Sequence, residues 1–168
     1  MEEETSPRAN IGGARGRARK LIKDARVTQA PVFINQLISI IQKDFNLRIS
    51  RTNALPDKCD ALTANVSGKI TIASNASKSL NRQKFSVGHE IGHLYMGHVH
   101  TGGQINLDSR EINEVEANAF GAELIMPLSL LKKDVMQERD IKELAKLYAV
   151  SEEAMGWRLL ETGLFKKM

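Results

Sequence analysis

The sequence predicts an α+β fold in which a short strand-forming region lies between helical segments. Three segments have the composition and alternation of strands, namely 47–50, 61–65 and 69–74. Ser67-Gly68, between the last two, is a hairpin turn signal. The segments before and after this region carry apolar residues at helical spacing, which completes the mixed class.

The chain begins with a polar segment rich in glycine, arginine and glutamate. Residues 1–18 are expected to be a disordered basic leader. A solubilising tail is the favoured interpretation, and contact of the basic run with nucleic acid or an acidic partner is the alternative. A short helix is predicted over residues 19–26, and Ala30-Pro31 marks a boundary before a longer helix over residues 32–45.

Composition indicates one main domain in a reducing compartment. The 168 residues are 42% hydrophobic, which is enough for one sizeable core, and the formal net charge is +4. Cys59 is the single cysteine, so no internal disulfide can form. There is no apolar signal core at the N-terminus, and no segment approaches the roughly 20 apolar residues of a membrane helix. A cytoplasmic protein without a membrane partner is expected.

The most informative segment is Gly88-His89-Glu90-Ile91-Gly92-His93. On a helix, His89 and His93 lie one above the other, and Glu90 lies about 100° away from His89. Two neutral imidazoles at this spacing suit one zinc ion, and the adjacent carboxylate suits a general base that acts on a water. Ordinary helix histidines are the alternative. It is disfavoured because the apolar residues form the opposite face of the same helix: Val87, Ile91, Leu94 and Tyr95.

A zinc site with two histidines needs a third protein ligand, and the helix predicted over residues 109–126 offers carboxylates. With Glu114 at zero on the helical rotation, small and apolar residues fall within about 40° of it, whereas Glu116 and Glu123 lie near about 180–200°. We therefore expect Glu116 and Glu123 on the solvent face. Glu114 is expected to point inward, where a metal would offset the cost of burying it.

Glu114 is thus the predicted third ligand. Glu111, on the same side of the helix, is the second choice, and a buried ion pair between Glu114 and Arg82 is the alternative without a metal. Asn118, one turn after Glu114, is placed for a hydrogen bond to a ligand. Three further polar residues near the motif receive no assigned role: Tyr95, His98 and His100.

The C-terminal region, residues 131–168, is predicted to be helical. Residues 141–164 have the spacing of two helices around a turn, with Ser151 at the start of the second, as in a helix-turn-helix unit. A DNA-binding unit needs basic residues on its second helix, which offers only Arg158 among glutamates. A packing module or a docking surface for a partner is therefore favoured over direct DNA binding.

Together these motifs resemble those of the ImmA/IrrE family of metallopeptidases over roughly residues 30–165. The resemblance is carried by the His-Glu-x-x-His motif and by three further segments: 82–85, 114–120 and 123–127. It implies a zincin-like metalloprotease domain over residues 19–130, with a small β-sheet packed on the motif helix. The C-terminal helices then follow as a region that resembles a helix-turn-helix unit.

The resemblance also implies roles for individual residues. His89, His93 and Glu114 are expected to bind Zn2+, with Mn2+ as the alternative metal, and Glu90 is expected to be the general base. Members of this family cleave helix-turn-helix transcriptional repressors and so relieve repression. The expected function is therefore a cytoplasmic zinc metalloendopeptidase that acts as an anti-repressor on an XRE-type repressor. The strand over residues 69–74 is expected to pair with an extended substrate.

Two alternatives to the protease remain. The first is a regulator that binds a repressor or DNA without cleaving it, around a structural metal. Glu90 argues against this alternative because a structural site has no need of a base. The second is a deformylase-like zinc hydrolase with Cys59 as its third ligand, but the residues around Cys59 lack the deformylase motif.

Overall fold

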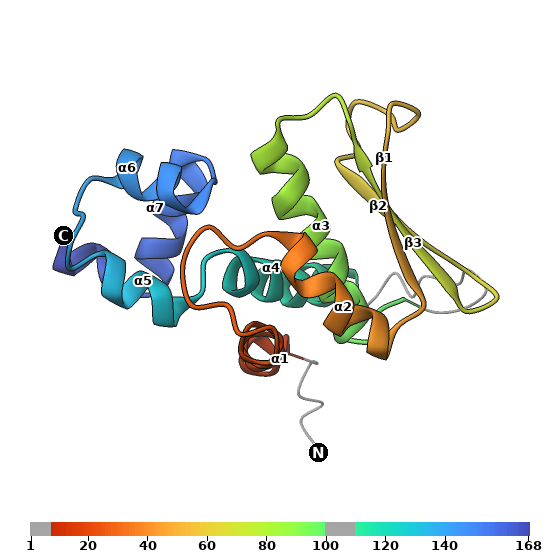
Figure 1. The fold of residues 1–168 in the computed structure, drawn as a ribbon, viewed down its shortest axis with the longest axis horizontal. Coiled ribbons are helices and arrows are strands. Elements are labelled where there is room, and N and C mark those ends of the chain that lie inside the picture. Colours follow the sequence, from red (N-terminus) through yellow and green to blue (C-terminus); the bar gives the residue numbers. More distant parts are fainter. Residues whose placement is uncertain (1–7, 100–109) are drawn as a thin grey trace, which may run out of the picture.

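The fold is arranged around a central helix (Figure 1). The computed structural model describes residues 8–99 and 110–168. A small β-sheet covers one side of helix α3 (Leu80–Tyr95), and helix α4 (Arg110–Ile125) packs against its other side. Helix α1 (Ile11–Asp24) packs along α4. No helix within these two ranges is long and apolar enough to cross a membrane.

Three strands form the sheet of the described residues: β1 (Leu47–Thr52), β2 (Ala61–Val66) and β3 (Lys69–Asn75). Helix α2 (Ile34–Asp44) leads into the first of them. The strand order is β1-β3-β2, with β3 parallel to β1 and antiparallel to β2. Ser67 and Gly68 have positive φ values of 51° and 79°, as a two-residue hairpin turn requires. The predicted strands and hairpin are confirmed.

The middle position of β3 corrects one expectation about the sheet. This strand was expected to pair with an extended substrate, but it already has a strand on each side. In the described sheet β1 and β2 are the edge strands, and no described strand pairs with the outer edge of β2. Thr63 on β2 lies opposite Ile72, which is fully buried, so both side chains point to the α3 side of the sheet.

Helix α1 corrects the prediction of a disordered leader over residues 1–18. Asn10 caps this helix by accepting the backbone N–H of Gly13 at 2.8 Å, and residues 11–18 form its first turns. Ala14 and Ala18, one turn apart, are fully buried in the main core. The buried face of this helix is formed partly by alanines, which add little apolar character to the sequence. The composition of the segment therefore did not predict a packed helix. Residues 1–7 lie outside the described residues.

The packing of α4 corrects the orientation predicted for its carboxylates. Glu116 and Glu123, expected on the solvent face, are only 8% and 1% exposed. Glu114, expected to point inward, has 49% of its side chain exposed. The helix is covered by α3 on one side and by α1 on another, so two of its faces are buried. The buried carboxylates are paired: Glu116 accepts the backbone N–H of Asn10 at 2.6 Å, and Glu123 accepts Arg19 Nε at 3.0 Å.

Three helices gather at the end of the molecule away from the sheet (Figure 1): α5 (Leu128–Asp134), α6 (Ile141–Tyr148) and α7 (Glu152–Glu161). A short 3-10 helix, Leu164–Lys167, follows them. They enclose a second hydrophobic cluster, which also includes Ile125 and Met126 at the end of α4. Ser151 caps α7, as predicted, by accepting the backbone N–H of Ala154 at 3.1 Å. The assignment of α6 and α7 as a helix-turn-helix unit stays a prediction.

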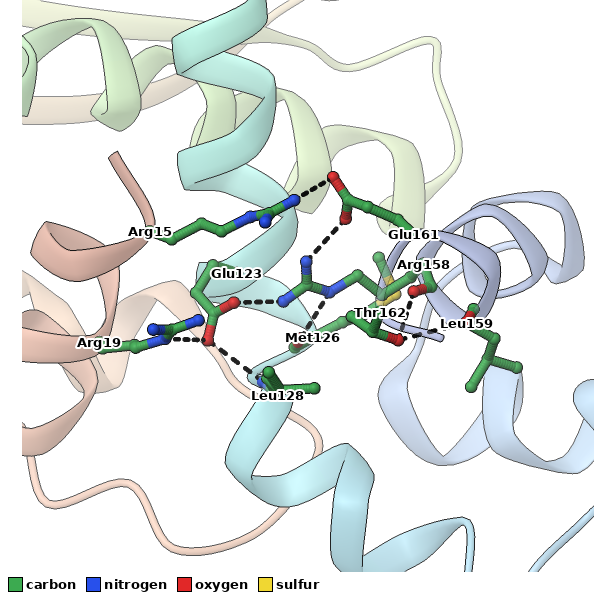
Figure 2. A network of polar contacts seen from close by, with 9 residues as sticks. All are labelled: Arg15, Arg19, Glu123, Met126, Leu128, Arg158, Leu159, Glu161 and Thr162. Carbon is green, nitrogen blue, oxygen red and sulfur yellow. Dashed lines mark hydrogen bonds and ion pairs between the residues drawn. The ribbon is translucent and has the colours of Figure 1, made fainter. Parts of the chain in front are cut away.

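A buried ion pair joins α7 to α4 (Figure 2). The side chains of Arg158 and Glu123 are each 1% exposed, and Arg158 Nη2 donates to Glu123. Arg158 also donates to the carbonyl of Met126 at 3.1 Å and to Glu161 at 2.8 Å, and Arg15 of α1 contacts Glu161 as well. The basic residue that the sequence offers for a DNA contact is therefore buried among protein acceptors.

Candidate metal centre

Helix α3 carries its two motif histidines apart from its apolar face. Val87, Ile91 and Leu94 are at most 5% exposed and belong to the main core, which confirms the predicted apolar face. The side chains of His89 and His93 are half-buried, with exposed fractions of 16% and 13%. The histidines therefore line the surface of the molecule without being fully solvated.

Two glycines let α3 and α4 approach closely. A Cβ atom at Gly92 would lie 2.9 Å from the carbonyl oxygen of Ala117, and one at Gly121 would lie 3.1 Å from the backbone nitrogen of His89. A side chain at Gly92 would therefore meet the backbone of the other helix. This close crossing brings Glu114, on the first turns of α4, beside the histidines of α3.

The three predicted ligands converge on one point. The Nε2 atoms of His89 and His93 are 3.0 Å apart, and Glu114 oxygens lie 3.2 Å from His89 Nε2 and 3.4 Å from His93 Nε2. Ligand atoms about 2.0–2.1 Å from a tetrahedral zinc ion are separated by about 3.3 Å. The Nε2–Nε2 distance, the distance from His89 Nε2 to Glu114 Oε2 and the distance from His93 Nε2 to Glu114 Oε1 are all close to this value. These separations fit the implied metal.

The second nitrogen of each ring is also engaged. His89 Nδ1 lies 2.8 Å from Asn118 Oδ1, the contact predicted for Asn118, and His93 Nδ1 lies 2.9 Å from His98 Nδ1. A ring that donates from Nδ1 keeps its Nε2 lone pair for a metal. Burial, with the neighbouring His89, lowers the pKa of His93 to about 4, so this ring is neutral near pH 7. Glu114 adds a carboxylate to the same point, so a bound cation would have a ligand atom from each of the three residues.

Glu90 lies in the same pocket and is held by the sheet. Thr63 Oγ1 on the edge strand β2 donates to Glu90 Oε2. Burial raises the pKa of Glu90 above its usual range, although the Thr63 hydrogen bond opposes this shift. A raised pKa suits a carboxylate that takes up a proton during a reaction. Sequence reasoning missed Thr63, because only the register of β2 against β3 reveals which way it points.

The pocket around these groups belongs to a longer depression. Six of its lining residues are Cys59, Ala61, His89, Glu90, Glu114 and Asn118. Phe85 of α3 lines this pocket and also the two pockets beside it. Those neighbouring pockets reach Ala154 and Trp157 on α7, and Trp157 is 67% exposed. The depression thus extends from the converging acceptors to the C-terminal helices.

The alternatives to Glu114 lie apart from the convergence point. Among the described residues, the group of metal-ligating atoms that meets there contains neither Glu111 nor Cys59. Glu111 is exposed, and the Cys59 thiol donates to a backbone carbonyl at 3.2 Å. Arg82, the proposed ion-pair partner, binds Asp60 at 2.9 Å instead.

The residues left without a role have different positions. The hydroxyl of Tyr95 donates to Asp44 at 2.9 Å, and its ring packs between Phe45 and Phe120. His98 contacts His93, as described above. His100 lies outside the described residues.

A small sheet, a helix with two histidines and a glutamate, and a second helix with a third acceptor define an α+β protein with a candidate metal centre. A peptidase family model described as an IrrE N-terminal-like domain matches residues 42–160. The chain belongs to this family. Membership suggests a metallopeptidase-like or regulatory role, and the family is metal-dependent in general.

Among solved structures, a Mycobacterium tuberculosis transcriptional regulator is similar to this chain, with a TM-score of 0.68 and 15% sequence identity. The match covers 87% of this chain and 46% of the regulator, so the chain spans less than half of that protein's length. At this identity the likeness shows a common fold. No match was found among curated proteins.

Proposed function

We propose that this protein is a zinc-dependent endopeptidase that cleaves a helix-turn-helix repressor of the XRE type and thereby relieves repression. The observation that carries the proposal is the convergence of acceptor atoms from His89, His93 and Glu114, with Glu90 in the same pocket. A structural zinc site is closed by protein ligands and has no need of a base beside it. Glu90 therefore favours hydrolysis over a purely structural metal.

In the proposed reaction, His89, His93 and Glu114 hold the metal. A Zn2+ ion held there would supply Lewis-acid chemistry to the scissile carbonyl and the attacking water. Glu90 accepts the proton of the attacking water as the new C–O bond forms. It then donates that proton to the leaving amine as the C–N bond breaks. The same ligands also accept Mn2+, which is the alternative metal.

The sheet supports a polypeptide substrate. Among residues 8–99 and 110–168, no strand pairs with the outer edge of β2, the strand whose Thr63 holds Glu90. An extended peptide that adds to this edge gains backbone hydrogen bonds and passes beside the base. The depression that Phe85 lines then gives the remainder of the substrate a surface towards Trp157 on α7.

The proposal is tested with purified, metal-loaded protein and the helix-turn-helix repressor encoded beside its gene, followed by intact mass measurement. One discrete cut is expected, and a chelator should prevent it. Glu90→Gln is the matched control, because the amide oxygen can still accept the Thr63 hydroxyl while the side chain no longer takes up a proton. This variant should keep its zinc and lose cleavage. Cleavage that continues in Glu90→Gln rejects Glu90 as the base.

The second candidate function is a regulator that binds a repressor or DNA without cutting it. The fold shared with a transcriptional regulator favours this candidate. A stable complex between the metal-loaded protein and the repressor, without any cut, would support it over the peptidase. Direct DNA binding has less support, because Arg158 is buried in α7.

A further inference from the structure

Two buried polar residues form a chain behind His93. The Nδ1 atom of His98 lies 2.9 Å from His93 Nδ1, and the Nε2 atom of His98 lies 2.8 Å from Glu116 Oε2. The side chains of His98 and Glu116 are only 8% and 11% exposed. The other oxygen of Glu116 accepts the backbone N–H of Asn10 at 2.6 Å. Every polar atom along this chain therefore has a partner.

The partners determine the direction of each hydrogen bond. The two oxygens of Glu116 face the backbone N–H of Asn10 and the Nε2 atom of His98, and a carboxylate oxygen accepts at both contacts. The His98 tautomer that carries its proton on Nε2 donates to this carboxylate, and its Nδ1 is then an acceptor. This acceptor can bond only to a protonated Nδ1 of His93. The Nε2 atom of His93 is left with its lone pair, 3.0 Å from His89 Nε2.

We propose that His98 and Glu116 are positioning residues that hold the ring of His93 with its Nε2 lone pair directed at the metal, and so set the zinc affinity. This inference rests on the metal site of the proposed function. Partners of this kind orient a ligating ring and raise its basicity, and their loss typically weakens metal binding by about 10–100-fold. His89 has a simpler support, the single amide of Asn118.

The start of α1 takes part in the same arrangement. Asn10, which caps α1, supplies the N–H that fixes the Glu116 carboxylate, and α1 packs along α4, which carries Glu116. Glu116 therefore cannot rotate away from His98 without leaving a backbone donor unpaired. In this way the N-terminal helix, remote in sequence from the motif, helps to orient one of its histidines.

The test compares two substitutions of His98 in the full-length protein. His98→Phe keeps a ring of similar volume and removes both nitrogens. His98→Asn loses the ring but places an amide oxygen near the position of Nδ1, where it can accept from His93. Zn2+ affinity is measured by competition with a chromophoric chelator. The inference predicts a loss of about 10–100-fold in His98→Phe and a loss below about tenfold in His98→Asn.

A packing role for His98 predicts the opposite order, because phenylalanine preserves packing better than asparagine. Tyr95→Phe is the matched control, since it removes a hydrogen bond to Asp44 from the helix that carries His93 and should leave Zn2+ affinity unchanged. Imidazole 15N spectra of the zinc-loaded protein provide a second readout, independent of peptidase activity. They should show a proton on His93 Nδ1 in the wild type.

Equal affinity of His98→Phe and the wild type, or weaker binding by His98→Asn than by His98→Phe, would overturn the inference. If His98→Phe does not fold, Glu116→Gln replaces it, because one acceptor oxygen becomes an NH2 group and cannot serve both donors. That variant should bind Zn2+ about tenfold more weakly, and unchanged binding would again overturn the inference. A wild-type protein that binds no Zn2+ would instead refute the metal site of the proposed function, before any variant is compared.

Discussion

Substitution of Arg158 by methionine should strongly destabilise the protein. The substitution leaves Glu123, which is 1% exposed, without its buried guanidinium partner. Removing one partner of a buried ion pair costs about 3–5 kcal/mol. The lower end applies, because Glu123 keeps Arg19 Nε at 3.0 Å and the backbone N–H of Leu128 at 3.2 Å. We expect a loss of about 3 kcal/mol in the free energy of unfolding.

A thermal melt followed by circular dichroism measures this loss. For a chain of 168 residues, each kcal/mol corresponds to about 2–4 °C in Tm, so Arg158→Met should lower Tm by about 6–12 °C. Arg15→Met is the matched control in the same network. Its ion pair with Glu161 is partly exposed, at 27% and 41%, and should contribute about 1 kcal/mol or less.

A double-mutant cycle then tests whether the pair itself is responsible. Glu123→Leu alone removes the buried carboxylate partner of Arg158 and leaves it only the partly exposed Glu161, whereas the double variant removes both buried charges, so it should lose less stability than the sum of the single variants. Equal Tm losses in Arg158→Met and Arg15→Met, or strict additivity in the cycle, would refute the argument that burial makes this pair important.

Three further predictions follow from the contacts around the site. Thr63→Val should keep zinc but lower the cleavage rate by about tenfold, because Glu90 loses a hydrogen bond worth about 1.5 kcal/mol. An unchanged cleavage rate would contradict a role for Thr63 in holding Glu90. Gly92→Ala should lower the free energy of unfolding by about 1–3 kcal/mol, because the added methyl group would lie 2.9 Å from the Ala117 carbonyl oxygen. A denaturant titration measures this loss, and an unchanged midpoint would show that α3 and α4 separate easily. Deleting residues 1–18 should lower both Tm and Zn2+ affinity, because the first turns of α1 are removed; full stability in the truncated protein would restore the interpretation of a dispensable tail.

Local sequence patterns predicted the parts of the fold that depend on neighbours along the chain. The strands around Ser67-Gly68 and the cap at Ser151 follow from turn and capping preferences that act over a few residues. The helical spacing of His89 and His93 likewise brought the two imidazoles together. Burial on α4 could not be predicted in this way. It depends on α1, whose Asn10 and Arg19 satisfy carboxylates that the sequence places at the surface.

The same distinction applies within the candidate site. Glu114 could be chosen from helical rotation, although for a reason that the structure corrects, because its side chain is 49% exposed beside the histidines. The supports of the site come from elsewhere in the chain: Thr63 from an edge strand and Glu116 from the buried side of α4. The residues that support the site have no fixed spacing from the His-Glu-x-x-His motif, so no sequence pattern predicts them. The inference about His98 makes metal affinity in this protein depend on packing between α1 and α4 as well as on the ligands themselves.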